Sequence, residues 1–268
     1  MKDTINKIFE FPVDELQDYL DVIEEAISLL NRGELKVCEK SPTGGWVVNQ
    51  WAKKAILLYF RTQKMEIIDN PPFRFFDKIP LKQWSEKDKV RVVPQALARY
   101  GSFVDEGAIL MPSYINIGAY VGKGTLVDTW ATVGSCAYVG ANVHLSGGVG
   151  IGGVLEPLQA NPVIIEDNCF IGSRCILVEG VQVGQGAVIG AGVTITGSTK
   201  IFDVSEGHQK EYRGFIPENS VVIPGSMEKE FPAGQFHVPC ALIIGKRKAS
   251  TDEKTSLNDA LREFQVPV

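Results

Sequence analysis

The sequence is poor in residues that build metal centres, disulfide frameworks or nucleic-acid surfaces. Its 268 residues include only three histidines and five cysteines, and no two cysteines are spaced as CxxC. The odd cysteine count favours free thiols in a reducing compartment. Lysine and arginine number 27 against 32 aspartates and glutamates, so the formal net charge is −5. Because no basic surplus is present to meet phosphates, we expect no nucleic-acid partner.

Long apolar runs are also missing. No stretch approaches the roughly 18 to 20 apolar residues that a membrane span needs. The opening segment, MKDTINKIFEFPVDELQDYL, carries acids where a signal peptide needs an apolar run. We therefore expect a cytoplasmic protein without a membrane partner. With 44% hydrophobic residues, the chain can form one large core or two small ones.

What the sequence does contain is a six-residue period in two blocks. The apolar positions are Phe103, Ile109, Ile115, Val121, Val127, Val133 and Val139, then Ile165, Ile171, Leu177, Val183, Ile189, Ile195 and Ile201. Small or slim residues follow four positions later, at Thr125, Ala131, Ala137, Val143, Cys169, Cys175, Val181, Ala187, Val193 and Thr199. Neither a helix nor a single strand has this period, but short strands joined by tight turns, three per coil, do. The pattern predicts a β-solenoid, a parallel β-helix with the aliphatic side chains inside. We expect glycines such as Gly122 and Gly134, which directly follow the large residue, to relieve strain at the bends.

The flanking regions predict two further parts. Residues 1–98 read as a helical N-terminal cap domain, with helices near 14–33 and 47–62 and a proline-bounded connector at 71–80. Residues 99–202 form the β-helix, and 203–268 form C-terminal strands with a short helix near 255–265. Between the two blocks the period slips by two, which predicts an excursion near 152–162 that we expect to act as a flap.

The central string resembles a known enzyme family. It reads ILMPSYINIGAYVGKGTLVDTWATVGSCAYVGANVHLSGGVGIGGVLEPLQANPVIIEDNCFIG, and the likeness extends upstream through GGWVVNQWAKKAILLYFR and RVVPQA. These segments resemble the tetrahydrodipicolinate N-succinyltransferases of the hexapeptide-repeat acyltransferase superfamily. The resemblance implies a left-handed β-helix, a homotrimer and an active site in a groove between subunits. It implies transfer of succinyl from succinyl-CoA to the amine of ring-opened tetrahydrodipicolinate (L-2-amino-6-oxoheptanedioate), in lysine and diaminopimelate biosynthesis, with CoA as cosubstrate and no permanently bound cofactor.

The resemblance also implies a catalytic acid. Acyl transfer to an amine needs a proton acceptor, a stabilised oxyanion and a channel for the thioester. Asp128 stands where neighbouring repeats have glycine and matches the family's catalytic aspartate in VDTWATVGS. The family's second acid aligns with Ile176, which places a two-carboxylate mechanism in doubt here. Glu179 is the nearest acid and a weaker catalytic candidate.

Other positions are candidates for binding. Arg91 in RVVP matches a family arginine that binds substrate, by bidentate pairing with a carboxylate. His144, the only histidine in the coils, is either a base or structural. The further substrate-binding candidates are Ser146, Gly147 and Arg174. The CoA-binding candidates are Gly172, Ser173, Gly190, Ala191, Lys200 and Lys246, with Arg247 and Lys248 beside the last. We expect no metal site.

Three alternatives stay open at this point. One is an N-acetyltransferase or a related amino-diacid acyltransferase of the same fold, which comparing succinyl-CoA with acetyl-CoA would distinguish. A zinc-dependent β-helix carbonic anhydrase needs three histidine ligands, so one histidine in the coils disfavours it. The third is a catalytically weakened scaffold trimer, supported only by Ile176.

Overall fold

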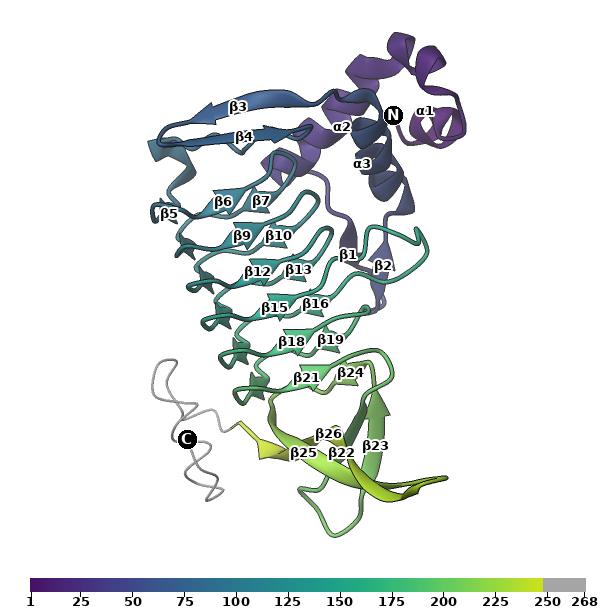
Figure 1. Ribbon diagram of the computed structural model, residues 1–268, viewed down its shortest axis with the longest axis vertical. Coiled ribbons are helices and arrows are strands. Elements are labelled where there is room, and N and C mark those ends of the chain that lie inside the picture. Colours follow the sequence, from purple (N-terminus) through teal and green to yellow (C-terminus); the bar gives the residue numbers. More distant parts are fainter. Residues whose placement is uncertain (248–268) are drawn as a thin grey trace.

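The computed structural model describes residues 1–247, in three parts stacked along one axis (Figure 1). Helices occupy the N-terminal end, short parallel strands form the middle, and an antiparallel sheet lies at the other end. The predicted helix near 255–265 and Lys248 lie outside the described residues.

The middle part is a left-handed parallel β-helix, as predicted. Its two-residue strands are β5 Arg91–Val92, β6 Leu97–Ala98, β7 Phe103–Val104, β8 Ile109–Leu110, β9 Tyr114–Ile115, β10 Tyr120–Val121, β11 Leu126–Val127, β12 Thr132–Val133, β13 Tyr138–Val139, β14 His144–Leu145, β15 Gly150–Ile151, β16 Ile164–Ile165, β17 Phe170–Ile171, β18 Ile176–Leu177, β19 Gln182–Val183, β20 Val188–Ile189, β21 Thr194–Ile195 and β24 Phe215–Ile216. Each coil gives one strand to each of three faces. Face A holds β5, β8, β11, β14, β17 and β20; face B holds β6, β9, β12, β15, β18 and β21; face C holds β7, β10, β13, β16, β19 and β24.

The phase of the six-residue period is confirmed from Ile115 onward and is wrong before it. The second residue of each strand fills the core, so Val104 and Leu110 point inward instead of Phe103 and Ile109. The turn from β8 to β9 is only 111–113, one residue shorter than the later turns, and this shifts the register. Phe103 lies outside instead, with its ring 5.1 Å from that of Tyr120.

The glycines that follow the inward residues have a different role from the predicted relief of bending strain. A Cβ on Gly134 would lie 2.1 Å from the Gly153 nitrogen, and one on Gly122 would lie 2.5 Å from the Gly140 carbonyl carbon. Successive coils therefore touch backbone to backbone at these positions. The left-handed glycines are other turn residues, such as Gly124 with φ 68°.

The N-terminal part contains α1 (Lys2–Ile8), the 3₁₀ helix η1 (Val13–Tyr19), α2 (Leu20–Arg32) and α3 (Gln50–Thr62). Their apolar faces share one core with Ile117 and Cys136 of the coils. Gly33 ends α2 as predicted: it has φ 75°, and its N–H donates to the carbonyls of Leu29 and Leu30.

Two hairpins were not predicted in this part. β1 (Cys38–Lys40) pairs with β2 (Trp46–Val48), so α3 begins three residues later than expected. The proline-bounded segment is not a plain connector, because β3 (Glu66–Asn70) pairs with β4 (Phe73–Asp77).

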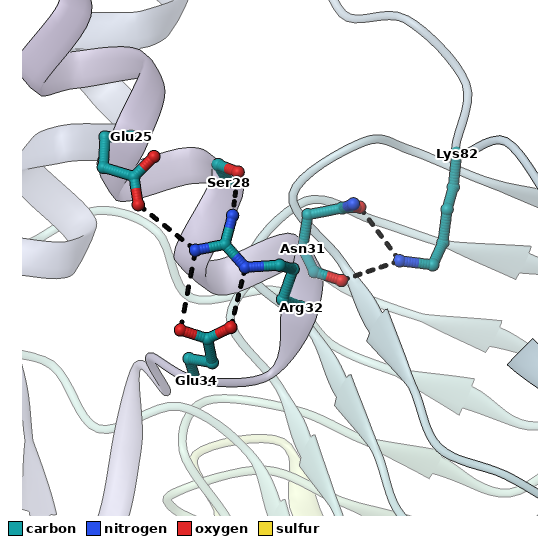
Figure 2. Close-up of polar contacts among 6 residues, drawn as sticks. All are labelled: Glu25, Ser28, Asn31, Arg32, Glu34 and Lys82. Carbon is teal, nitrogen blue, oxygen red and sulfur yellow. Dashed lines mark hydrogen bonds and ion pairs between the residues drawn. The ribbon is translucent and has the colours of Figure 1, made fainter.

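A buried lysine joins the helical part to the first coils. Lys82 is 8% exposed, and its Nζ donates to the Asn31 carbonyl at 2.8 Å, to Asn31 Oδ1 at 2.9 Å and to the Ser102 carbonyl at 3.1 Å. Figure 2 shows the two bonds to Asn31 beside the exposed cluster in which Arg32 pairs with Glu25 and Glu34. Burial lowers the pKa of Lys82 to about 8, against a smaller opposing effect of the Asp88 charge.

The C-terminal part closes the other end of the coils. It contains β22 (Lys200–Asp203), β23 (Lys210–Arg213), β25 (Ser220–Phe231) and β26 (Gly234–Lys246). β25 begins as one more parallel strand of face A, because Val221 and Val222 pair with β20. It then forms a long antiparallel pair with β26.

The chain leaves the coils between β15 and β16, at residues 152–163. This excursion is fixed to the rest of the molecule at several points. Leu155 packs against the helical core, and the Val154 N–H donates to the Ser135 carbonyl at 3.1 Å. The fully buried Lys53 of α3 donates from Nζ to the Ala160 carbonyl at 2.7 Å. The excursion thus reaches the helical part, next to β1 and β2 (Figure 1).

Candidate functional site

One corner of the β-helix, between faces A and B, collects most of the predicted site residues. Asp128, Ser146, Gly172 and Gly190 occupy the same turn position in four successive coils. Each backbone N–H donates to the carbonyl of the last strand residue in the next coil, at 2.7 to 3.0 Å. Gly147, Ser173 and Ala191 form the next column, and Arg174 belongs to the column after that. We call this stack of turns the A–B corner.

Asp128 is the only acid among these residues. It directly follows β11 and is partly buried. Its Oδ1 accepts from the Thr129 N–H at 2.6 Å and from the Thr129 hydroxyl at 3.2 Å. These bonds fix the orientation of the carboxylate. Oδ2 has no hydrogen-bond partner within residues 1–247 and is available to a ligand.

His144 lies beside Asp128 on face A, where it pairs with Leu126 of β11. Its ring centroid is 4.8 Å from that of Phe170. Burial lowers the pKa of His144 below its usual 6.5, and the Asp128 charge opposes this shift only in part. The imidazole is therefore mainly neutral at pH 7 and able to accept a proton.

Two hydrogen-bond donors lie one coil from Asp128. Ser146 is 6% exposed, and its hydroxyl makes no hydrogen bond to the described residues. The Gly147 N–H likewise donates to no residue within 1–247. Hydroxyl and amide donors without partners suit an oxyanion or a carboxylate.

Three other predicted residues lie at different places. Arg91 is exposed on β5 of face A, two strands from β11. Ile176 lies on face B with its side chain outward and 37% exposed. Glu179 lies at the opposite corner, between faces B and C, where its Oε2 accepts the Gly197 N–H at 3.1 Å. A single chain therefore does not bring Glu179 together with Asp128.

The predicted basic residues for CoA are also separated from the A–B corner within one chain. Lys200 lies in β22, 3.4 Å from the carboxylate of Glu211. Lys246 donates from Nζ to the Glu218 carbonyl at 2.8 Å, and Arg247 donates to the Asn168 carbonyl at 2.8 Å. These last two residues lie at the corner between faces C and A.

Other kinds of site receive no support from the described part of the chain. Residues 1–247 contain no group of three or more His, Cys, Asp or Glu placed to hold a metal ion. All five thiols are free and buried. None of the helices within these residues is long and apolar enough to cross a membrane.

Trp130 was missed by the sequence reasoning. It follows Asp128 by two residues, is 63% exposed and has φ 61°. The signal was available, because the matching turn position is a glycine in two other coils, at Gly148 and Gly192. A tryptophan in that position departs from the pattern of the repeat.

The fold and the corner together define a left-handed β-helix of the hexapeptide-repeat transferase class. Residues 162–197 match the family model "Hexapeptide repeat of succinyl-transferase". Residues 1–62 match "Tetrahydrodipicolinate N-succinyltransferase N-terminal".

Curated relatives give the particular family. The chain is 53% identical over 251 residues to a 2,3,4,5-tetrahydropyridine-2,6-dicarboxylate N-succinyltransferase of Acinetobacter baylyi, covering 91% of this chain and 90% of the relative. It is 54% identical over 250 residues to the enzyme of that name from Variovorax paradoxus, covering 91% and 90%. A solved structure of a putative 2,3,4,5-tetrahydropyridine-2-carboxylate N-succinyltransferase from Campylobacter jejuni is 17% identical, covering 84% of this chain and 62% of that one, with a TM-score of 0.46. The chain belongs to the tetrahydrodipicolinate N-succinyltransferase family, as its sequence resemblance implies.

Proposed function

We propose that this protein transfers the succinyl group of succinyl-CoA to the amine of ring-opened tetrahydrodipicolinate, a step of lysine and diaminopimelate biosynthesis. Two relatives that are 53% and 54% identical to this chain, each matched over 90% of its own length, are named for this activity. The observation that carries the mechanism is the Asp128 carboxylate, held by Thr129 with one oxygen free, one coil from the donors of Ser146 and Gly147.

Asp128 is the proton acceptor in this mechanism. The acceptor amine arrives as an ammonium, and Asp128 holds it by charge and takes one proton. The freed nitrogen attacks the thioester carbonyl, so a C–N bond forms and the carbonyl oxygen becomes an oxyanion. The C–S bond then breaks as the oxyanion re-forms the carbonyl, the nitrogen gives up its second proton, and the departing CoA thiolate takes up that proton, which leaves a neutral amide and a free thiol. Positioned proton acceptors of this kind contribute roughly 100- to 10,000-fold to rate.

Ser146 and Gly147, neighbouring residues one coil from Asp128, stabilise negative charge. Their hydroxyl and N–H groups are without partners in the described chain, so they need not break a bond to donate to an oxyanion or a substrate carboxylate. Arg91, on the same face, supplies a guanidinium for a carboxylate of the acceptor. His144 is the alternative base, because its lowered pKa leaves it neutral beside Asp128.

A second chain completes the site in this proposal. The pantetheine arm lies along Gly172–Ser173 and Gly190–Ala191, but Lys200, Lys246 and the excursion are at other corners of the same chain. A homotrimer with parallel solenoid axes brings those groups of one chain to the A–B corner of its neighbour. Light scattering at micromolar concentration should give three times 29.3 kDa. A monomer would contradict both the trimer and the shared site.

The turnover test uses thiol release. With the acceptor present, succinyl-CoA should release free CoA thiol in step with the formation of an N-succinyl product seen by mass spectrometry. Acetyl-CoA is the matched donor and should turn over more slowly. Thiol release that does not depend on the acceptor would refute the proposed transfer, and a preference for acetyl-CoA would refute the acyl assignment.

A further inference from the structure

Trp130 has a backbone conformation that its side chain disfavours. Its φ of 61° lies in the left-handed region, which costs a non-glycine residue about 1 to 2 kcal/mol. Its N–H donates to the Pro112 carbonyl at 2.6 Å, as the turn requires, but its side chain stays 63% exposed. Within the described chain, this largely exposed side chain therefore gains little packing to offset the strain of placing a tryptophan here. Strain of this kind concentrates at functional sites.

The other coils of the A–B corner have the same backbone conformation at this position. The same turn position is left-handed in all four coils, with φ values of 61° at Trp130, 70° at Gly148, 62° at Arg174 and 74° at Gly192. Glycine is the unstrained choice and occupies two of the four. The two large side chains stand on either side of Gly148. Their coils are two strand spacings apart, about 10 Å.

The Arg174 side chain lies across this glycine. A Cβ built on Gly148 would be 2.7 Å from Arg174 Cδ, 2.8 Å from Nε and 3.0 Å from Cζ. The guanidinium therefore extends over Gly148. Within residues 1–247, Arg174 has no carboxylate within 4.0 Å and its side chain makes no hydrogen bond. This surface therefore presents an unpaired cation.

These residues form one surface, which we call the corner patch: Trp130, Ser146, Gly147, Gly148 and Arg174. An indole borders one side and a guanidinium the other, with hydroxyl and amide donors between them. Asp128 lies in the same turn as Trp130. An aromatic face packs on methylene groups, and a guanidinium pairs with a carboxylate through two parallel hydrogen bonds.

We propose that the corner patch binds a carboxylate at the end of a short aliphatic chain, with Arg174 pairing with the carboxylate and Trp130 packing against the methylenes. This inference rests on the proposed function and deepens it. Two reactants carry such a group: the succinyl donor and the dicarboxylate acceptor. Both have the same chemistry at the patch.

The test separates the two sources by changing the donor. Arg174→Gln is assayed with succinyl-CoA and with butyryl-CoA, which has the same four-carbon chain without the carboxylate. If the donor carboxylate binds, kcat/KM for succinyl-CoA should fall about 10- to 100-fold, the loss of a charge-assisted hydrogen bond, while that for butyryl-CoA stays within twofold. If the acceptor carboxylate binds, both donors should lose the same factor and the acceptor KM should rise. Either result supports the patch.

Trp130 is tested by Trp130→Ala, with Trp130→Phe as the conservative variant. Trp130→Ala should reduce kcat/KM for the same acyl donors as Arg174→Gln does, and Trp130→Phe should keep most of the kcat/KM of the unmodified protein. Arg74→Gln and Phe76→Ala are matched controls, because both residues are exposed on β4. Light scattering is run on each variant.

Several results would overturn the inference. One is that Arg174→Gln and Trp130→Ala both stay within twofold of the unmodified protein in every arm. Another is that Trp130→Ala breaks up the oligomer, because Trp130 would then be a subunit contact. If the unmodified protein shows no transfer, the proposed function fails, and the patch is tested alone by titrating succinate and glutarate against tryptophan fluorescence. Quenching that is lost in both Trp130→Phe and Arg174→Gln would support the patch, and no quenching would overturn it.

Discussion

Lys82 gives the sharpest test of how the helical part is attached to the coils. Lys82 is 8% exposed, and its ammonium is held by three neutral oxygens, with no carboxylate in contact. Its pKa is lowered from 10.5 to about 8, chiefly by burial. Because the folded pKa lies below the unfolded one, the folded protein carries the full cost of the buried charge below pH 8. That cost disappears as the pH rises toward 10.5, so stability attributable to Lys82 should increase with pH.

The magnitude follows from the two pKa values. A difference of one pKa unit between the folded and unfolded states corresponds to about 1.4 kcal/mol. Most of the increase in unfolding free energy that begins near pH 8 is complete by pH 9.5. Relative to Lys82→Met, the unmodified protein should gain about 2 kcal/mol in unfolding free energy between pH 7 and pH 9.5. In thermal unfolding experiments, the same effect should change the difference between the two proteins' melting temperatures by roughly 4 to 8 °C.

The assay is urea denaturation of both proteins at four pH values, because effects of other titrating groups cancel in the difference. Lys123→Met is the control, because the Glu106 carboxylate raises the pKa of Lys123. The difference in unfolding free energy between the unmodified protein and Lys123→Met should therefore not grow between pH 7 and pH 9.5. A Lys82 difference that stays flat or falls between pH 7 and 9.5 would refute the assignment of a buried lysine with a lowered pKa at this joint.

Three further changes test the coils and the excursion. Gly134→Ala should cost roughly 2 kcal/mol or more in unfolding free energy, because its Cβ would lie 2.1 Å from the Gly153 nitrogen. Gly190→Ala is the control and should cost much less, because the atom nearest to its Cβ would be 3.2 Å away. Equal losses of stability in urea titrations would contradict the backbone contact at Gly134. Leu155→Ala should lower stability by roughly 1 to 2 kcal/mol, because this side chain packs on the helical core; an unchanged midpoint would show the excursion to be unattached. Ile176→Glu should fold with an unchanged melting temperature, because the Ile176 side chain is 37% exposed. If one carboxylate suffices for catalysis, this variant should change the transfer rate by less than twofold. A large rise in the transfer rate would show that a second acid is missing.

The periodic part of the fold could be predicted because each coil is a local unit. Val127 and its equivalents point inward in every repeat from Ile115 onward, and the small second positions such as Cys169 are buried. The phase at Phe103 was lost because the shortened turn is invisible in the sequence. Phe103 and its neighbour Val104 are both apolar, so either could have filled the core.

The buried cation in α3 was beyond sequence reasoning. The predicted helix near 47–62 forms as α3, but the structure fully buries one of its lysines, Lys53. Its partner is the Ala160 carbonyl, more than a hundred residues away. A lysine in a helix is ordinarily a surface residue, and only the excursion supplies the oxygen that makes its burial tolerable.

The candidate site divides in the same way. Asp128, Ser146 and Gly172 fall into one column because the six-residue period and the two-residue slip set their alignment. The positions of Lys200 and Lys246 depend on how β22 and β26 cross the end of the coils, where the period has ended. No local pattern in the sequence encodes that crossing.

The role of Asp128 is tested most directly by the rate of thiol release by Asp128→Asn, which keeps the size of the side chain and removes its charge. We expect transfer to fall roughly 100-fold or more, with the melting temperature and the calorimetric affinity for CoA unchanged. Glu179→Gln should cost far less, because that carboxylate bonds the Gly197 N–H at another corner. Full activity in Asp128→Asn would contradict the central claim that this carboxylate accepts the proton of the substrate amine.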